Sequence, residues 1–517
     1  MRLLPLLLLA ACTGPKDPED TAEPAETAAP DTADTAQETA ETDETAETAE
    51  TAETAETADP VIDNDGDGVS PDDGDCNDAD PLVYTGAVDV VCDGIDANCD
   101  GVGLDDAFVV NEERYPDLVT ALSVVADGDT IDVCPGIWVQ NVVIETPMAL
   151  TLRGWSADNT DTELDGGSLG PVIVVGPGVD LTIEDIGIIN GVATWRNDDV
   201  EQSGGGIWAD DAFLTLRRAR FTNNTAQDVG GGVAVRVGDS STSGLLVEDS
   251  EFTDNRASSD GGAIAVIGAG DADVTISTST FTANQAPTNG GALSFEGAPL
   301  SVTVSDSDFA TNATSGRRGM GGAIAATGDE VRLTLTDGTL SGNTSGADGA
   351  AVGMTADRSI LYMDSNTFSA NIAVTGGGGL IVDSSAMEVE LNSSTFDGNQ
   401  GSTQGGAVEL SGGGTASFNS IVSTDNSGGN AGGAYYLDEG DGLSLVLTLN
   451  GGMVNTNRAG IGGGGGIYAT GARVESNAAD FGADVSTNSP EDVYMCSQDF
   501  TSAATFVFDE STGSFCQ

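Results

Sequence analysis

The chain has 517 residues, a formal net charge of −68 and no histidine. So acidic a protein is not expected to bind nucleic acids or other polyanions, because it repels them and attracts divalent cations. The lack of histidine excludes His-ligated zinc sites, Ser-His-Asp triads and histidine general bases.

Residues 1–11 predict a secretory signal peptide. One Arg precedes an apolar run from Leu3 to Leu9, and two alanines stand before Cys12. The run is too short to span a membrane. The sequence "LAAC" resembles the bacterial lipobox, which implies that Cys12 is lipidated and anchors the protein in the outer membrane, displayed at the cell surface. An ordinary signal peptide with a chance cysteine is the alternative.

Residues 12–60 predict a disordered stalk. The segment consists mainly of Thr, Ala, Glu, Asp and Pro and includes the run "TAETAETAETAETA". It has almost no large apolar side chains, so it cannot bury enough surface to offset the entropy of ordering. A transient helix is the alternative. The threonines of the stalk could carry O-glycans.

Residues 61–104 predict a small metal-binding module. Asp63, Asp65 and Asp67 occupy positions 1, 3 and 5 of a calcium loop, and Gly68 occupies position 6, where a sharp turn needs glycine. The twelfth position is glycine instead of glutamate, so the segment is not an EF-hand. Asp73 or Asp75 could complete the ligand set. Calcium is the expected cofactor, and an acidic loop held by disulfides without an ion is the alternative.

The module also resembles the metal-binding motif "DxDGDG…DCND…CDGxDNDCDG" that is repeated in secreted proteins of deltaproteobacterial type. Ala97 and Asn98 depart from that pattern, which weakens a second site. The candidate ligands are Asp63, Asp65, Asp67, Asp73, Asp75, Asp78, Asp93, Asp96 and Asp100.

Six cysteines follow Cys12, and a secreted protein is expected to pair them. Cys496 and Cys516 stand alone near the C-terminus, in residues 491–517, where we expect a cap closed by their disulfide. The remaining Cys76, Cys92, Cys99 and Cys134 allow three pairings, which the sequence leaves open.

Residues 105–145 predict a capping helix and the first coil of a solenoid. The apolar residues Leu118, Ala121, Leu122 and Val125 share one helical face, and a strand follows the break at Gly128. The segment resembles the beginning of pectin-lyase-like β-helices, a fold that both enzymes and proteins without catalytic activity share.

Residues 146–490 predict an all-β, single-stranded, right-handed parallel β-helix. A glycine cluster alternates with an F-x-x-N motif, and Phe221, Phe252, Phe281 and Phe309 follow one another at spacings of 31, 29 and 28 residues. This period suits one coil of a solenoid. A helical solenoid is disfavoured because the segments lack a period of 3.6 residues. We expect Phe to stack on Phe, Asn to form a ladder that fades at Asn457, and glycines to allow close backbone approach.

The two motifs resemble the repeat of polymorphic outer-membrane proteins, a family found on bacterial surfaces that includes many adhesins. The resemblance implies a non-catalytic adhesin that binds a glycan or a cell-surface ligand. A purely structural envelope protein is one alternative, and a polysaccharide lyase or hydrolase is another. The arginines and acidic or aromatic residues that such an enzyme could use are Arg217, Arg218, Arg220, Arg317, Arg318, Asp198, Asp199, Asp210, Asp211, Trp195 and Trp208.

Overall fold

The computed structural model describes residues 62–88, 90–99, 107–194, 202–238, 243–268, 272–297, 300–440, 443–460, 462–477, 479–482, 488–489, 492–495 and 513–515. All of them belong to the unit Val61–Gln517, one of two into which the chain divides. The predictions for the signal peptide, Cys12, the stalk, Asp100, Cys496 and Cys516 lie outside the described residues, as do Trp195, Asp198 and Asp199.

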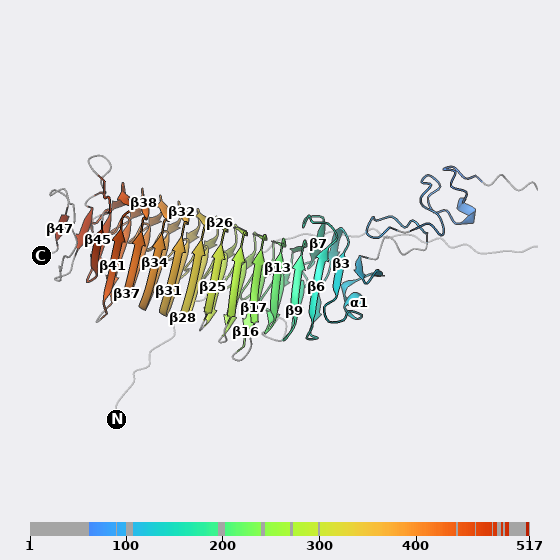
Figure 1. Ribbon diagram of the computed structural model, residues 1–517, viewed down its shortest axis with the longest axis horizontal. Coiled ribbons are helices and arrows are strands. Elements are labelled where there is room, and N and C mark those ends of the chain that lie inside the picture. Colours follow the sequence, from blue (N-terminus) through green and yellow to red (C-terminus); the bar gives the residue numbers. More distant parts are fainter. Residues whose placement is uncertain are drawn as a thin grey trace, which may run out of the picture. The chain divides into compact units, whose positions relative to one another are not determined.

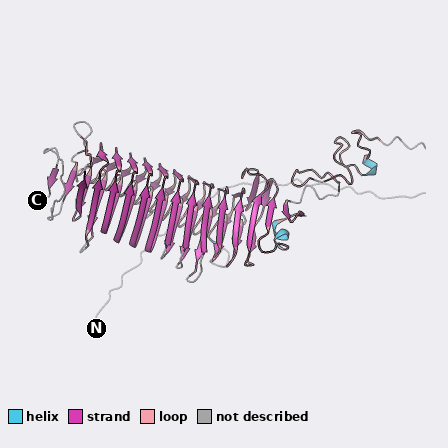
Figure 2. Ribbon diagram, in the orientation of Figure 1, coloured by secondary structure: helices cyan, strands magenta, loops and turns pink. Residues whose placement is uncertain are grey.

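The repeats form a parallel β-helix, as the sequence predicts. Strands of successive coils lie side by side in parallel rows, and the described strands make three sheets that enclose one core (Figure 1, Figure 2). Each repeat contributes two strand segments to the first sheet, one short strand to the second and one to the third. In four consecutive coils the two segments of the first sheet merge into one long strand, as in β31 (Val352–Asp364).

The first sheet contains these strands: β1 (Phe108–Val110), β2 (Glu113–Tyr115), β3 (Thr130–Val133), β5 (Val142–Ile144), β6 (Ala149–Gly154), β8 (Ile173–Val175), β9 (Asp180–Glu184), β12 (Ile207–Asp210), β13 (Phe213–Arg217), β16 (Val233–Val237), β17 (Ser243–Glu248), β20 (Ile264–Gly268), β21 (Ala272–Ser277), β24 (Leu293–Gly297), β25 (Leu300–Ser305), β28 (Ile324–Thr336), β31, β34 (Leu380–Asn392), β37 (Val408–Asn419), β40 (Tyr435–Glu439), β41 (Leu445–Asn450), β44 (Ile467–Thr470), β45 (Arg473–Asn477), β46 (Val493–Met495) and β47 (Gly513–Phe515).

The second sheet includes the strands that carry the repeated Phe. Its strands are β4 (Gly136–Val139), β7 (Thr162–Asp165), β10 (Gly187–Ile189), β14 (Arg220–Thr222), β18 (Glu251–Thr253), β22 (Thr280–Thr282), β26 (Asp308–Ala310), β29 (Thr339–Ser341), β32 (Thr367–Ser369), β35 (Thr395–Asp397), β38 (Val422–Thr424) and β42 (Met453–Asn455). The third sheet follows the repeated Asn: β11 (Val192–Ala193), β15 (Thr225–Ala226), β19 (Arg256–Ala257), β23 (Gln285–Ala286), β27 (Ala313–Thr314), β30 (Thr344–Ser345), β33 (Ile372–Ala373), β36 (Gln400–Gly401), β39 (Ser427–Gly428) and β43 (Arg458–Ala459).

The phenylalanines stack along the core, which confirms the prediction. Phe252, Phe281 and Phe309 pair in register and are fully buried. The ring centroids of neighbouring pairs lie 4.9 and 4.8 Å apart. This distance equals the usual spacing of hydrogen-bonded strands, so the rings stack without disturbing the backbone ladder. Leu340 takes the ring's place in one coil.

The asparagines form a continuous buried ladder at the turn between the second and third sheets. Asn284, for example, donates from Nδ2 to Oδ1 of Asn312 at 3.0 Å and to the carbonyl of Phe252 at 2.9 Å. Its own Oδ1 accepts from the backbone N–H of Asn255 at 3.1 Å. Each side chain therefore satisfies two buried backbone groups of the preceding coil, which would otherwise cost free energy, and bonds to the Asn side chain of the next coil.

The ladder reaches one coil further than the sequence pattern indicated. Asn457 donates to Asn488, whose Nδ2 donates in turn to the carboxylate of Asp492 at 2.8 Å. Asn488 lacks the preceding Phe of the motif, so only the structure reveals its role.

The paired glycines meet two distinct steric demands. Gly290 has a φ of +62°, and a Cβ there would lie 1.9 Å from the carbonyl oxygen of Leu293. Gly291 faces the next coil, where a Cβ would lie 2.1 Å from the carbonyl oxygen of Gly322. The first glycine is therefore required by the turn and the second by the close approach of neighbouring coils.

The N-terminal cap consists of a short helix and two short strands that pair antiparallel. Helix α1 (Leu118–Leu122) begins where the Asp117 side chain accepts from the Thr120 N–H, and it buries Leu118 and Ala121. The prediction is confirmed for Leu118, Ala121 and Leu122, whereas Val125 lies beyond the end of the helix and packs against the core from the following turn. Strands β1 and β2 pair antiparallel with each other, and β1 also pairs antiparallel with β3, an arrangement that the sequence did not predict. Together they cover the open end of the core.

Replacing Phe281 with Ala should lower the free energy of unfolding by about 3 to 5 kcal/mol, because it opens a cavity between two stacked rings. The matched control is Thr303→Ala on the exposed face of β25, which should change stability by less than about 0.5 kcal/mol. Denaturant unfolding measures both. The assigned register would be wrong if Thr303→Ala were the more damaging substitution.

Candidate metal centre

The loop that precedes η1 (Pro71–Asp73) is wound tightly around its own carboxylates. The Asp63 carboxylate accepts from the N–H of Gly66 at 2.7 Å and of Gly68 at 3.0 Å. Both glycines have positive φ angles. Asp65 and Asp67 each accept a backbone N–H from two residues further on. The sequence D-x-D-G-D-G therefore folds so that three carboxylates lie on the inside of one turn.

Three acids in this module hold oxygens that are buried without a hydrogen-bond partner. They are Oδ2 of Asp65, Oδ2 of Asp67 and Oδ2 of Asp75. Ligand oxygens of Asp63, Asp65 and Asp67 all lie within 4.8 Å of one another. Unpartnered buried carboxylate oxygens are costly unless a proton or a cation satisfies them. The residues therefore fit a hard cation that takes oxygen ligands.

The charges of the cluster act on one another. Loss of solvent raises the pKa of Asp65, and the carboxylates of Asp67, Asp75 and Asp63 add to this effect, while the hydrogen bond from the Asp67 N–H opposes it. Asp75, which is buried, thus belongs to the same electrostatic group as the three loop acids. A bound cation would reverse the sign of this interaction.

The other predicted ligands in the described part of the module have different surroundings. Asp73 is exposed and accepts from the Ser70 hydroxyl at 3.0 Å, so Asp75 is the acid that faces the loop. Asp78 accepts from the Asn64 N–H at 2.8 Å and holds the loop from outside. Asp93 accepts from the Ile95 N–H in its own turn. Asp96 is half-buried near Cys99.

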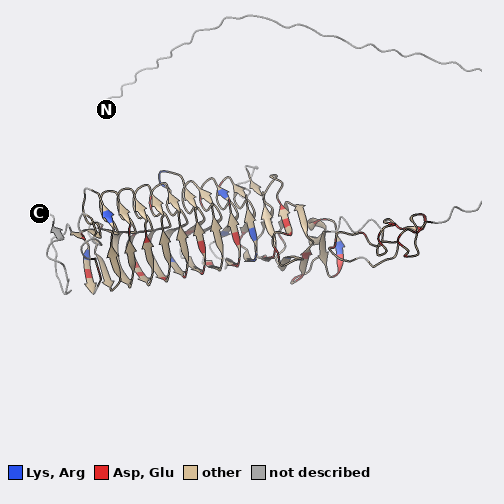
Figure 3. Ribbon diagram, turned by 90° about the horizontal axis from the view of Figure 1, so that it is seen from above, with Lys and Arg blue, Asp and Glu red and all other residues tan. Residues whose placement is uncertain are grey.

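Two disulfides settle the pairing that the sequence left open. Cys76 pairs with Cys99 inside the module, and Cys92 pairs with Cys134, which directly follows β3 of the first coil. The Cys76–Cys99 bridge starts next to Asp75 and closes a separation of 23 residues. The Cys92–Cys134 bridge connects the module covalently to the β-helix. Figure 3 shows in red the acidic residues on the loops of the module.

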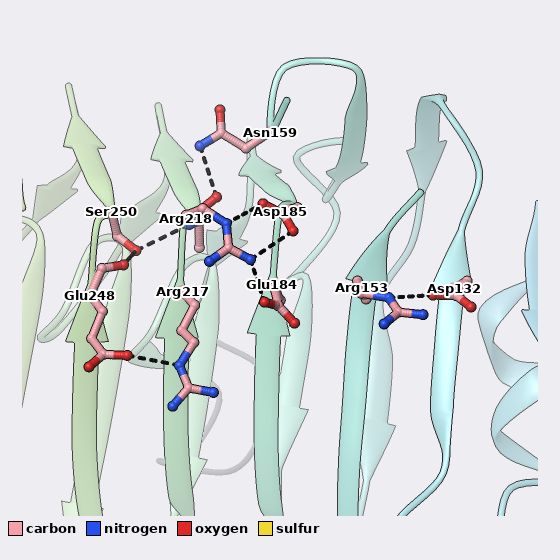
Figure 4. Close-up of polar contacts among 10 residues, drawn as sticks. Asp132, Arg153, Asn159, Glu184, Asp185, Arg217, Arg218, Glu248 and Ser250 are labelled. Carbon is pink, nitrogen blue, oxygen red and sulfur yellow. Dashed lines mark hydrogen bonds and ion pairs between the residues drawn. The ribbon is translucent and has the colours of Figure 1, made fainter. Parts of the chain in front are cut away.

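The arginines considered as catalytic candidates lie on the coils, and three of them are held in ion pairs between coils. Figure 4 shows the pairs of Arg217 and Arg218. Arg217 contacts Glu248 at 2.8 Å, and Arg218 contacts Asp185 at 2.7 Å. Arg220 pairs with Glu163. Arg317 and Arg318 are exposed in a turn. Asp210 pairs with Arg236, Asp211 accepts from the Gly238 N–H, and Trp208 is buried.

Comparison with known families agrees with both parts of the structure. Residues 205–427 match a family model described as "Right handed beta helix region". Residues 75–103 match a family model whose name refers to copper binding and whose description is "Putative metal-binding motif". No curated protein and no solved structure matched the chain. This chain is a right-handed β-helix protein with that motif at its N-terminal side.

The family match begins at Asp75 and therefore includes only one of the four clustered acids. Asp63, Asp65 and Asp67 precede it. No helix among the described residues is both long and apolar enough to cross a membrane.

If the ion is calcium, as the sequence predicts, replacing Asp65 or Asp75 with Asn should abolish its binding by this module, because each substitution removes a charge and a candidate ligand oxygen. Calorimetry of the full chain should give a dissociation constant of about 0.1 to 1 mM, the range of extracellular calcium modules. The full chain is needed because Cys92 of the module forms its disulfide with Cys134, which lies outside the module. The control Asp72→Asn alters an exposed neighbour and should bind normally. A flat titration of the unaltered chain would leave only a disulfide-held acidic loop.

Proposed function

We propose that this protein is a lipid-anchored surface protein of the outer membrane, in which the β-helix is a binding scaffold without catalytic activity and calcium stabilises the N-terminal module. The observation that carries the proposal is an open groove of about 630 Å³ on the flank of the coils. Its acidic lining is Asp228, Asp260, Glu296 and Asp329.

The groove spans several coils, and Val229 and Ile267 line it together with the four acids. Burial raises the pKa of Asp228, and the nearby charge of Asp260 raises it further. Asp260 accepts from the Asn289 N–H at 2.7 Å, so it is fixed by the next coil. Such a surface favours ligands that carry cationic groups, or glycans that bind through a bridging divalent cation. A rigid scaffold that holds several carboxylates in a row suits a cell-surface ligand of this chemistry.

Calcium is the proposed ion of the module because its candidate ligands are carboxylates. Oxygen ligands suit calcium, whereas copper prefers imidazole and sulfur ligands. The chain has no histidine, and the four cysteines of the described module and first coil are consumed in disulfides.

The surroundings of the arginines support binding over lyase chemistry. A lyase base must lose its proton, yet hydrogen bonds from Arg218 to Asp185 and Glu184 raise the pKa of Arg218 above its ordinary value. Arg218 holds Asp185 through two nitrogens, at 2.7 and 3.0 Å, and Arg217 holds Glu248 on the opposite coil (Figure 4). These pairs join one coil to the next, which accounts for the arginine cluster as a structural feature.

A glycan and cell-binding array with the purified protein tests the scaffold role. We expect binding without turnover, and we expect Asp228→Asn with Glu296→Gln to weaken it, because both acids line the groove. The control Glu388→Gln removes one charge from the exposed face of β34 and should leave binding unchanged. Turnover of an acidic polysaccharide would support the enzyme alternative, and neither binding nor turnover would support a structural envelope protein.

The anchor has a separate test. Replacing Cys12 with Ser removes the thiol to which acyl chains would attach, so the variant should leave the membrane fraction or stall during processing. Labelling the cells with a fatty acid shows directly whether the protein carries acyl chains. Stable anchoring needs more than one such chain. Unchanged labelling of the Cys12→Ser protein would contradict the lipid anchor.

A further inference from the structure

The groove on the flank of the coils takes one acid from each of four successive coils. Asp228 and Asp260 lie in the turns that precede β16 and β20. Glu296 lies on β24 and Asp329 on β28. These four strands pair in parallel in that order. With strands about 4.8 Å apart, the first and the last acid are separated by about 14 Å along the stack of coils.

The bottom of the groove is apolar. Val229 is buried and Ile267 is half-buried, whereas three of the four acids are exposed. Both apolar residues pack in a small cluster with Trp208, which is separate from the main core of the β-helix. The carboxylates therefore form the rim of the groove, and the edge of this second apolar cluster forms its bottom.

Two glycines of the lining keep side chains out of the groove. A Cβ on Gly297 would lie 2.4 Å from the carbonyl oxygen of Gly268, and a Cβ on Gly328 would lie 1.9 Å from that of Gly297. The close approach of neighbouring coils therefore requires glycine at both positions. As a result, no side chain arises from the backbone at these two points of the lining.

The negative charge of the groove has no cationic partner within the described ranges of the chain. None of the ion pairs found there includes an acid of the groove. Arg236, which is the register partner of Ile267 in the preceding coil, pairs with Asp210 instead. The rim is therefore open to positive charge from a ligand.

The spacing of the acids does not suit a single bridging cation. Among the residues that the structure describes, only Asp63, Asp65 and Asp67 bring three ligand oxygens within 4.8 Å of one another. The acids of the groove are instead distributed along the stack, one to a coil. Such a row matches several separate positive charges better than one metal ion.

We propose that the groove binds an extended peptide segment with Lys or Arg at alternate positions. In an extended chain, side chains two residues apart point to the same side, so three alternate residues span about 13 Å, close to the length of the row of acids. Lys and Arg also have apolar stems below their charged heads. The stems can therefore pack on Val229 and Ile267 while the heads reach the carboxylates. This inference rests on the proposed scaffold role and names the class of its partner.

The test measures the binding of a labelled peptide, Lys-Thr-Lys-Thr-Lys, to the purified full chain by fluorescence anisotropy. EDTA and low ionic strength exclude bridging by divalent cations and limit screening. We expect saturable binding. The isomer Lys-Lys-Lys-Thr-Thr has the same charge and should bind about threefold or more weakly, because its lysines do not alternate.

A pair of double variants locates the binding site. Glu296→Gln with Asp329→Asn should lower the affinity for the alternating peptide about tenfold, since each exposed ion pair contributes a factor of about two to five. The matched control, Glu388→Gln with Glu390→Gln, removes the same charge from the exposed face of β34. It should bind the peptide as the unaltered protein does.

Two results would overturn the inference. One is equal affinity for the two peptides, or an equal loss in the two double variants, because either would show attraction to the net charge alone. The other is no binding of the alternating peptide by the folded protein. If a glycan then binds through the same acids in the array, the scaffold role stands and only the partner class is wrong. If the array is empty as well, the scaffold role is contradicted too.

Discussion

The fixed register between neighbouring coils is the constraint on which the rest of the structure depends. Parallel strands place each residue beside its counterpart one coil away, at about 4.8 Å. The Asn ladder enforces that spacing at one corner, since Asn284 bonds to both the preceding and the following coil. The stacked rings of Phe281 and its neighbours adopt the same distance. A shift of one residue would turn both rows away from their partners.

Register also explains how charges are arranged on so acidic a protein. Arg217 lies between Glu184 and Glu248 in the adjacent coils, so like-charge repulsion is relieved within the sheet. Arg218 likewise pairs with Asp185 of the preceding coil. The register therefore places charges of opposite sign beside one another along the sheet.

The N-terminal module is stabilised by other interactions than the β-helix. It has little apolar core, and its compactness depends on short turns, two disulfides and the carboxylates of the loop. The Asp63 loop is built from local hydrogen bonds, so its shape follows directly from the order of Asp and Gly. Asp75 is brought to it by the turn through η1, next to the Cys76–Cys99 bridge. Small domains of this kind need such covalent or ionic support.

The sequence alone determined the structure of one coil. Equivalent positions in successive repeats contact equivalent neighbours, so the same residue types recur there. The repeat pattern by itself assigns a role to Phe281, Asn284 and Gly290, and the order of Asp and Gly does the same for the Asp63 loop, whose contacts are local. Only the tertiary structure decided which distant residues meet. It paired Cys92 with Cys134, buried Asp75 while leaving Asp73 exposed, and extended the ladder to Asn488. Glu409 stands where other repeats carry residues as different as Ala265, Ile381 and Tyr436, so only the stacked coils show that this acid is buried.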